Sequence, residues 1–208
     1  MTSREQIMTA ATRHLNEDPA ASMARIAEAA GVSRATLHRH FSGRDDLMIA
    51  LGHRAHDRWH QVLVSAGVAE AAASSDPGEV GRALDALLSG LIEVADEYGF
   101  GLTDHALAVH PELSRRAEEL EEREIALYAA AQRTGLLRAD LPVRWISNTV
   151  YGLLVAVRDS LRRGDVARRD VHRLVTQTFL RGAASPAPED GRPSSGAHGG
   201  SASGGEGA

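Results

Sequence analysis

The chain has 208 residues, which is enough for one or two compact domains with a buried core. Hydrophobic residues make up 43% and aromatic residues only 4%, a composition that favours a helical bundle over a sheet protein. The net charge of −5 excludes a protein that binds nucleic acid over its whole surface, so any DNA-binding surface must be local.

The first predicted helix covers residues 3–15. Ser3 is a suitable N-cap, and Gln6 follows three residues later, as in a capping box. This N-terminus is amphipathic and lacks the apolar core of a signal peptide. The chain has no cysteine and no apolar run of about 18 residues, so we expect a cytoplasmic protein with no disulfide, no membrane contact and no cofactor.

Residues 21–47 predict two short helices joined by a tight turn. Ser22 can cap the first helix and Gly31 can end it, while Ser33 can cap the second helix. No acid occurs between Glu28 and Asp45, whereas three arginines lie in that window. A short helix with small, hydrogen-bond-donating residues at its start and cations for phosphates suits the major groove of DNA. The alternative is a helical hairpin with a basic, solvated face.

The string IAEAAGVSRATLHRHF, followed by SGRDDL, resembles the DNA-binding segment of the tetracycline-repressor (TetR) family of bacterial transcription regulators. The family pattern is IA-x-x-AGVS-x-x-T-L-Y-x-H-F, then a small polar loop, a basic residue, an acid and a leucine. The matching positions are Ile26, Ala27, Ala30, Gly31, Val32, Ser33, Thr36, Leu37, His40, Phe41, Ser42, Arg44, Asp45 and Leu47. The resemblance covers the first quarter of the chain well and the remainder only in general layout.

The outward positions of the second helix are the predicted DNA contacts. We expect Arg34, Ala35 and Thr36 to face base edges, while Arg39 can serve either bases or phosphates. The predicted phosphate contacts are Ser33, His38, His40 and Arg44. The family usually has tyrosine where His38 stands and lysine where Arg44 stands. Because histidine changes charge near neutral pH, we expect contact through His38 to depend on pH.

A long helix is predicted from Arg44 to residue 65, and further helices over residues 77–98, 111–134, 143–163 and 168–181. Residues 66–78 read as a loop with helical ends, and Thr103 can cap a short helix ending near residue 109. His53, His56 and His60 share one face of the long helix, where they could bind a metal, but a polar, solvated face is the better interpretation and no metal site is predicted. Residues 183–208 are rich in Gly, Ser, Ala and Pro and are predicted to be a disordered tail.

The family resemblance implies that the second domain encloses a ligand pocket and that its last two helices form a dimer. We expect the ligand to contact Leu91, Tyr98, Phe100, His105, Trp145, Asn148 and Thr149. The alternative is that the apolar members of this set are core residues and that the last two helices complete the core of one subunit.

The sequence therefore predicts an all-α protein with a helix-turn-helix DNA-binding domain (residues 1–47), a helical ligand-binding and dimerisation domain (48–182) and a tail (183–208). The predicted function is a TetR-family repressor that binds a palindromic operator as a homodimer and is released by a small-molecule effector of unknown identity. An alternative is a DNA-binding regulator without an effector, whose second domain serves only dimerisation or protein contact. An enzyme is not expected, because no acid/base pair, phosphate loop or nucleophile motif is present.

Overall fold

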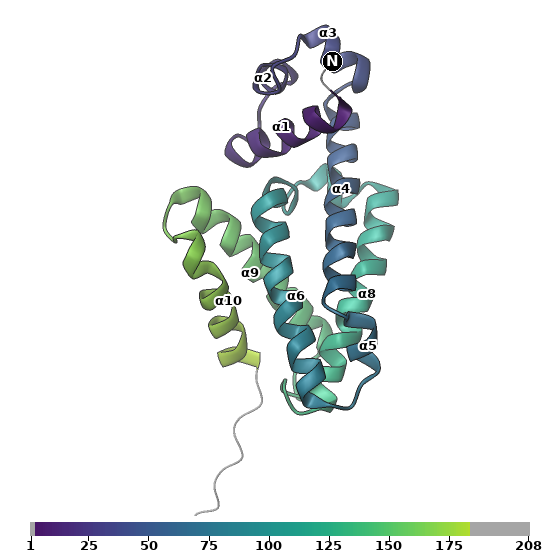
Figure 1. Cartoon of the computed structure of the whole chain (residues 1–208), viewed down its shortest axis with the longest axis vertical. Helices are drawn as coiled ribbons and strands as arrows, with labels where there is room; N and C mark the ends of the chain where they lie inside the picture. The colour runs from purple at the N-terminus through teal and green to yellow at the C-terminus, as the bar shows by residue number, and fades with distance from the viewer. Residues whose placement is uncertain (1–2, 184–208) are drawn as a thin grey trace, which may run out of the picture.

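A computed structural model describes residues 3–183, and within that range the chain is helical, as predicted (Figure 1). The elements are α1 (Arg4–Glu17), α2 (Met23–Ala29), α3 (Arg34–His40), α4 (Arg44–Ser65), α5 (Val68–Ala73), α6 (Pro77–Tyr98), the 3₁₀ turn η1 (Gly99–Gly101), α7 (His105–Ala108), α8 (Pro111–Arg133), α9 (Val143–Arg163) and α10 (Arg168–Ala183). The predicted tail lies outside the described residues except for residue 183, where α10 ends. No helix within residues 3–183 is both long enough and apolar enough to cross a membrane.

The helices begin and end largely where local side-chain chemistry predicts. Ser3 and Gln6 form the predicted capping box, with Oγ of Ser3 accepting from N–H of Gln6 at 3.2 Å. Ser22 and Ser33 cap α2 and α3, each accepting from the backbone N–H three residues later. Gly31 has a φ of 65°, the left-handed conformation that ends α2 and that glycine adopts without a steric penalty.

Two predicted details of the middle of the chain are wrong. The cap of the short helix α7 is Asp104, whose Oδ1 accepts from N–H of Leu107 at 3.1 Å, and not Thr103. The hydroxyl of Thr103 instead accepts from the guanidinium of Arg158 at 2.6 Å, a contact with α9 that sequence spacing does not reveal. Residues 66–78 also contain a helix of their own, α5.

The core divides into two hydrophobic clusters that share α4. The first joins α1, α2, α3 and the first half of α4, and it also includes Tyr98 and Phe100 from the far end of α6 and from η1. The second joins the rest of α4 to α5, α6, α8, α9 and α10. Figure 1 shows α4 running from the upper three-helix unit down into the bundle. The proposed domain boundary at residues 47 and 48 therefore falls within a continuous helix.

Asn16 on α1 ties the upper unit to the bundle. Its Nδ2 donates to the carbonyl oxygens of Asp96 at 3.2 Å and Glu97 at 2.6 Å, in the last turn of α6. Its Oδ1 accepts from N–H of Phe100 in η1 at 3.1 Å. One side chain thus satisfies three backbone groups at the end of α6 that the helix itself leaves unpaired.

Close packing of α4 against α6 depends on Gly90. A Cβ at this position would lie 2.8 Å from Cγ2 of Val62, a buried side chain, and would overlap its other methyl group as well. We expect Gly90→Ala to destabilise the protein by about 1–3 kcal/mol, the usual cost of overpacking. Gly81 is the control in the same helix, since a Cβ there would only make ordinary contact with Leu136 at 3.6 Å.

Gly81→Ala should raise the free energy of unfolding by up to about 1 kcal/mol, because alanine favours a helix over glycine. Urea unfolding followed by circular dichroism measures both changes. Equal stabilisation by the two substitutions would show that α4 and α6 do not approach as closely as described.

Candidate functional site

The short helix α3 presents the predicted DNA contacts on one side and is anchored on the other. Leu37 and Phe41 are fully buried in the first hydrophobic cluster. Arg34, Ala35, Ser33, His38 and Arg39 are exposed, and Thr36 and His40 are half-buried. The structure therefore brings all the predicted contacts of this helix to one side of the three-helix unit.

The cations of α3 are not neutralised by the protein. None of the hydrogen bonds and ion pairs among residues 3–183 includes the side chain of Arg34, Arg39, His38 or His40. Ser33 differs, because its hydroxyl caps α3 by accepting from N–H of Thr36 at 3.0 Å and lies 2.9 Å from the hydroxyl of Thr36. The helix thus offers the unpaired guanidinium groups of Arg34 and Arg39 to an anionic partner.

Arg44 has a role that its sequence position did not reveal. Its guanidinium donates to the carbonyl oxygens of Ala21 at 2.5 Å and Pro19 at 2.6 Å. These contacts fix the loop between α1 and α2 against the start of α4. The contact of Arg44 with a phosphate remains a prediction, and it would have to use the guanidinium N–H groups that the loop leaves free.

The second domain contains a partly open cavity of about 430 Å³ between α4, α6, α8 and α9, also lined by residues of η1 and α7. This volume is within the usual range for a small-molecule site, and the walls are largely apolar. Apolar lining residues include Ala55 and Trp59 from α4, Leu91 from α6, Leu113 from α8 and Leu154 from α9. The arrangement can hold a compact organic molecule, with one side open to solvent where the exposed residues Glu118 and Tyr151 line it.

Three of the seven predicted ligand contacts line this cavity, namely Leu91, Tyr98 and Asn148. The other four do not. Phe100 is buried in the cluster of the upper unit, and His105 is exposed on α7. Trp145 is 62% exposed near the start of α9, and the hydroxyl of Thr149 donates back to the carbonyl of Trp145 at 2.7 Å. Trp145 and Thr149 are four residues apart and share a face of α9 that does not line the cavity.

Glu124 is a functional candidate that the sequence interpretation missed. It lines the cavity, yet only 4% of it is exposed. Nε1 of Trp59 donates a short hydrogen bond to one carboxylate oxygen, and the hydroxyl of Tyr128 donates to the other at 3.3 Å. Burial raises the pKa of Glu124 to about 7, while these two hydrogen bonds oppose the rise. The spacing of the acids at residues 118, 121 and 124 of α8 is the signal in the sequence that places them along one helical face.

The three histidines of α4 do not converge. His53 lies 3.9 Å from a carboxylate oxygen of Glu112, and Nδ1 of His60 lies 2.8 Å from the guanidinium of Arg123. His56 packs edge-on against Trp59, with ring centroids 6.1 Å apart, and burial lowers its pKa to about 4. Over residues 3–183 the structure contains no cluster of three or more potential ligands that could hold a metal ion.

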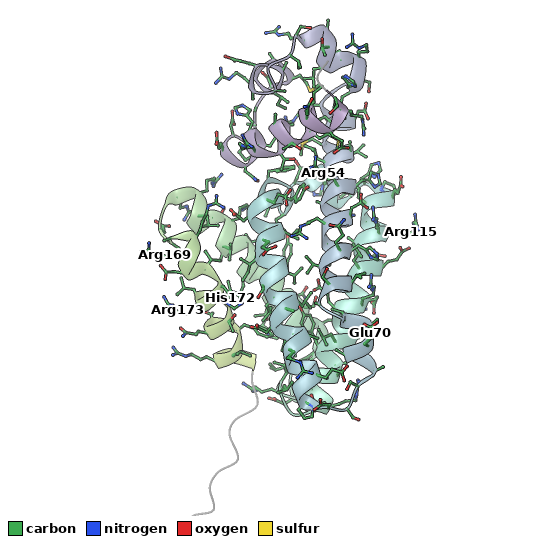
Figure 2. All side chains as sticks on the ribbon, in the orientation of Figure 1. Arg54, Glu70, Arg115, Arg169, His172 and Arg173 are labelled. Carbon is green, nitrogen blue, oxygen red and sulfur yellow. The ribbon has the colours of Figure 1, made fainter. Side chains whose placement is uncertain are left out.

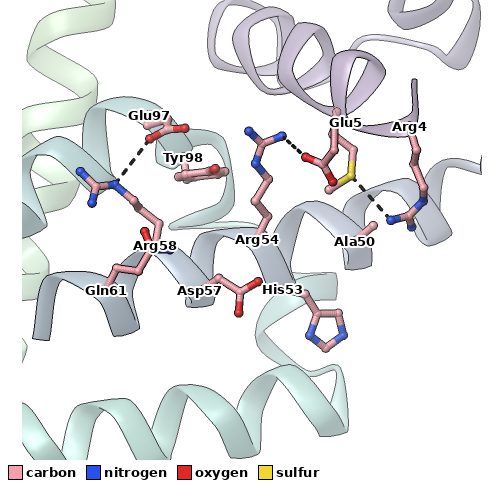
Figure 3. Close-up of a pocket in the computed structure, with 11 residues that line it drawn as sticks. Arg4, Glu5, Ala50, His53, Arg54, Asp57, Arg58, Gln61, Glu97 and Tyr98 are labelled. Atoms are coloured by element: carbon pink, nitrogen blue, oxygen red, sulfur yellow. Dashed lines mark hydrogen bonds and ion pairs between the residues drawn. The ribbon is translucent and has the colours of Figure 1, made fainter. Parts of the chain in front are cut away.

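A second, charged cleft of about 610 Å³ lies where α1 crosses α4 and the end of α6 (Figure 3). Arg54 points at Glu5 of α1, with 3.4 Å between their charged atoms, and Arg58 points at Glu97 of α6, at 4.0 Å. Figure 2 places Arg54 just below α1. Tyr98 lines both this cleft and the apolar cavity. The cleft is therefore a polar joint between the upper unit and the bundle, separated from the cavity by one aromatic side chain.

Apolar surface remains exposed along α9 and α10. A shallow groove between the two helices is lined by Leu153, Ala156, Leu174, Val175 and other residues. Leu174 and Leu180 are each 37% exposed. Arg169 and Arg173 point away from the bundle on the outer side of α10 (Figure 2). An apolar groove beside charged residues is typical of a protein interface.

Comparisons with known proteins agree with this arrangement. A family model described as bacterial regulatory proteins of the tetR family matches residues 7–51. The chain is 27% identical to the HTH-type transcriptional repressor LfrR of Mycolicibacterium smegmatis, covering 84% of this chain and 87% of the relative. It is 28% identical to the HTH-type transcriptional regulator NfxB of Pseudomonas aeruginosa, covering 88% and 95%.

The fold is shared with a crystal structure of the TetR-like regulator LfrR from Mycobacterium smegmatis in complex with proflavine. The TM-score is 0.67 at 24% sequence identity, and the alignment covers 88% of this chain and 97% of that chain. Both sequence relatives are named as transcription regulators.

Proposed function

Because the chain belongs to the TetR family of bacterial transcription regulators, we propose that it is a repressor that binds a near-palindromic operator as a homodimer and leaves it when a small molecule fills the bundle. The main support for this proposal is that Arg34 and Arg39 are exposed on α3 and have no partner within the described chain. A relative named as a repressor supports the direction of control.

In this proposal, residues 1–47 are the DNA-binding domain and α3 enters the major groove. Arg34, Ala35 and Thr36 at the start of α3 read base edges, since the first residues of a recognition helix reach deepest. The contacts to phosphates are assigned to Ser33, His38, His40 and Arg44, with Arg39 serving either role. These contacts set orientation and affinity, whereas the base-edge contacts set sequence preference.

The homodimer is proposed to form through α9 and α10. The exposed apolar groove between these helices supports the assignment. Gly152 and Ala156 are exposed one turn apart on α9 and are small enough for a helix of a second subunit to approach closely. Paired subunits place two copies of α3 on successive major grooves of an inverted repeat.

The effector is proposed to bind in the apolar cavity of residues 48–182. The similar regulator LfrR has been crystallised with proflavine, which supports a small-molecule site in this chain as well. Binding releases DNA only if the molecule has a higher affinity for a conformation in which the two α3 helices no longer match the operator. The second candidate is a regulator without an effector, whose bundle serves only dimerisation or protein contact.

Selection of bound duplexes from a random DNA library tests the DNA half of this proposal. We expect an inverted repeat whose half-sites are about one helical turn apart, because a two-fold dimer presents two equivalent copies of α3. Binding that is equally strong for all duplexes would contradict it. Operator binding that no molecule in a library of small organic compounds reduces would favour the second candidate.

A further inference from the structure

The charged residues that line the apolar cavity are mainly acidic. Three of the lining residues are glutamates, namely Glu118, Glu121 and Glu124, and none is an arginine. They follow one face of α8 at intervals of three residues. Glu118 is exposed, Glu121 is half-buried and Glu124 is buried, so carboxylates continue from the surface into the interior of the cavity.

Within the described chain none of these carboxylates has a cation at ion-pair distance, although Glu121 lies close enough to Arg144, the partner of Glu122, to contribute to the raised pKa of that arginine. Glu121 accepts from the hydroxyl of Ser147 on α9 at 3.0 Å, and both partners of Glu124 are uncharged donors, Trp59 and Tyr128. A buried carboxylate without a cation is costly, because its hydration is lost and nothing of opposite charge replaces it.

Aromatic side chains complete the site. Trp59 lines the cavity from α4, Tyr98 from α6 and Tyr151 from α9. The faces of these rings attract cations, most strongly for tryptophan and when water is excluded. An anion would find no arginine on the lining, and a purely apolar molecule would leave Glu124 without a counter-ion.

We propose that the cavity selects an organic cation with an apolar, aromatic body, whose positive charge pairs with Glu124 and Glu121 while its body fills the space between α4, α6, α8 and α9. This inference rests on the proposed effector site and assigns that site a ligand class. The cation supplies the opposite charge that buried Glu124 does not find among residues 3–183.

Three other titratable side chains near Glu124 have pKa values far from neutrality. Burial, with a contribution from the charge of Arg116 on α8, lowers the pKa of His56 on α4 to about 4, and burial raises the pKa of Tyr98 on α6 to about 12. Burial also raises the pKa of Tyr128 on α8 well above its usual value. The only other lining acids are Glu118 and Glu121, on the same helix. Glu124, with a pKa near 7, is therefore the group that links cation binding to pH.

The test compares three probes that share one ring system: N-methylacridinium, which carries a permanent charge, neutral acridine, and an acridine carboxylate. At pH 8, fluorescence titration of the full chain should give an affinity for N-methylacridinium at least about tenfold higher than for acridine, and weaker binding still for the carboxylate. The affinity for N-methylacridinium should rise about tenfold from pH 6 to pH 8, because binding needs ionised Glu124 and the ionised fraction of a group with a pKa near 7 rises by that factor.

Glu124→Gln is the diagnostic variant, since it keeps the size of the side chain and an amide oxygen that can accept from Trp59. It should lower the affinity for N-methylacridinium at least about tenfold and abolish the pH dependence, while acridine binding stays within about twofold. Glu119→Gln is the matched control, because Glu119 lies on the same helix but pairs with Arg115 at 3.1 Å on the surface. It should bind all three probes like the unmodified chain.

Equal affinity for the cation and the neutral ring, or preference for the carboxylate, would overturn the cation assignment. The absence of binding by all three probes would overturn it as well. These results would leave the repressor proposal unchanged, because operator selection and release of DNA test that proposal separately. Charge-selective binding of N-methylacridinium that depends on Glu124 would establish the site.

Discussion

Ala35→Glu is expected to reduce operator binding at least about 100-fold without unfolding the protein. Ala35 is the second residue of α3 and is exposed, so a longer side chain meets no packing obstacle. Its neighbours on the outer side are Arg34 and Thr36. A carboxylate at this point would face the phosphates and the base edges of DNA, and like-charge juxtaposition at an interface costs several kcal/mol. Electrophoretic mobility shift or fluorescence anisotropy with the selected operator measures the loss.

Ala69→Glu is the control for this substitution. Ala69 is the second residue of α5, is also exposed, and lies in the bundle and not in the three-helix unit. A glutamate in the first turn of a helix is neutral or slightly stabilising at both sites, so the two variants should have similar thermal stability. Operator binding by Ala35→Glu at the unmodified affinity would show that α3 does not enter the major groove.

Ala156→Arg is expected to dissociate the homodimer and, with it, to weaken operator binding at least about 100-fold. Ala156 is exposed and lines the groove between α9 and α10. An arginine there would bring a charge and a long side chain into the contact between subunits. A single subunit binds only one half-site and loses the high effective concentration that links the two halves. Analytical ultracentrifugation reports the oligomeric state, and anisotropy reports the binding.

Ala126→Arg provides the comparison for the dimer variant. Ala126 is an exposed alanine inside another helix of the same bundle, α8, and it does not line the groove. We expect this variant to remain a dimer with unmodified operator affinity. If both Ala156→Arg and Ala126→Arg remain dimeric and bind the operator equally well, the subunit interface lies on a different face. If both variants are monomeric, an added arginine at either site disturbs the bundle.

Local chemistry explains why the helix boundaries could be predicted. A serine cap acts on an N–H three residues away, as Ser3, Ser22 and Ser33 do, so the signal and its effect lie in the same short segment. Long apolar stripes predicted α4 and α9 with the bounds that the structure has. The exception is α7, where Thr103 and Asp104 are both good caps and a contact with Arg158, 55 residues away, decides between them.

The cavity was harder to predict, because its walls come from segments far apart in the chain. Trp59 and Glu124 are separated by 65 residues, and nothing near either one signals that they meet. Trp145 is a large aromatic residue of the kind that often lines a pocket, yet it lies on the exposed side of α9. A helix places every residue on one of several faces, and only the packing of neighbouring helices decides which face encloses space. The periodicity of the sequence predicted which face of α9 is apolar, but it did not predict which helices pack against that face.

The contact made by Asn16 has a thermodynamic consequence for the proposed regulator. Asn16 holds the end of α6 and the start of η1, while Tyr98, Gly101 and Leu102 from the same turn line the cavity. Free-energy coupling between two sites is reciprocal. If a molecule in the cavity lowers the affinity for DNA through this contact, bound DNA lowers the affinity for the molecule by the same factor. Copies of the protein on the operator would therefore need a higher concentration of the molecule than free copies, and the free copies would respond first.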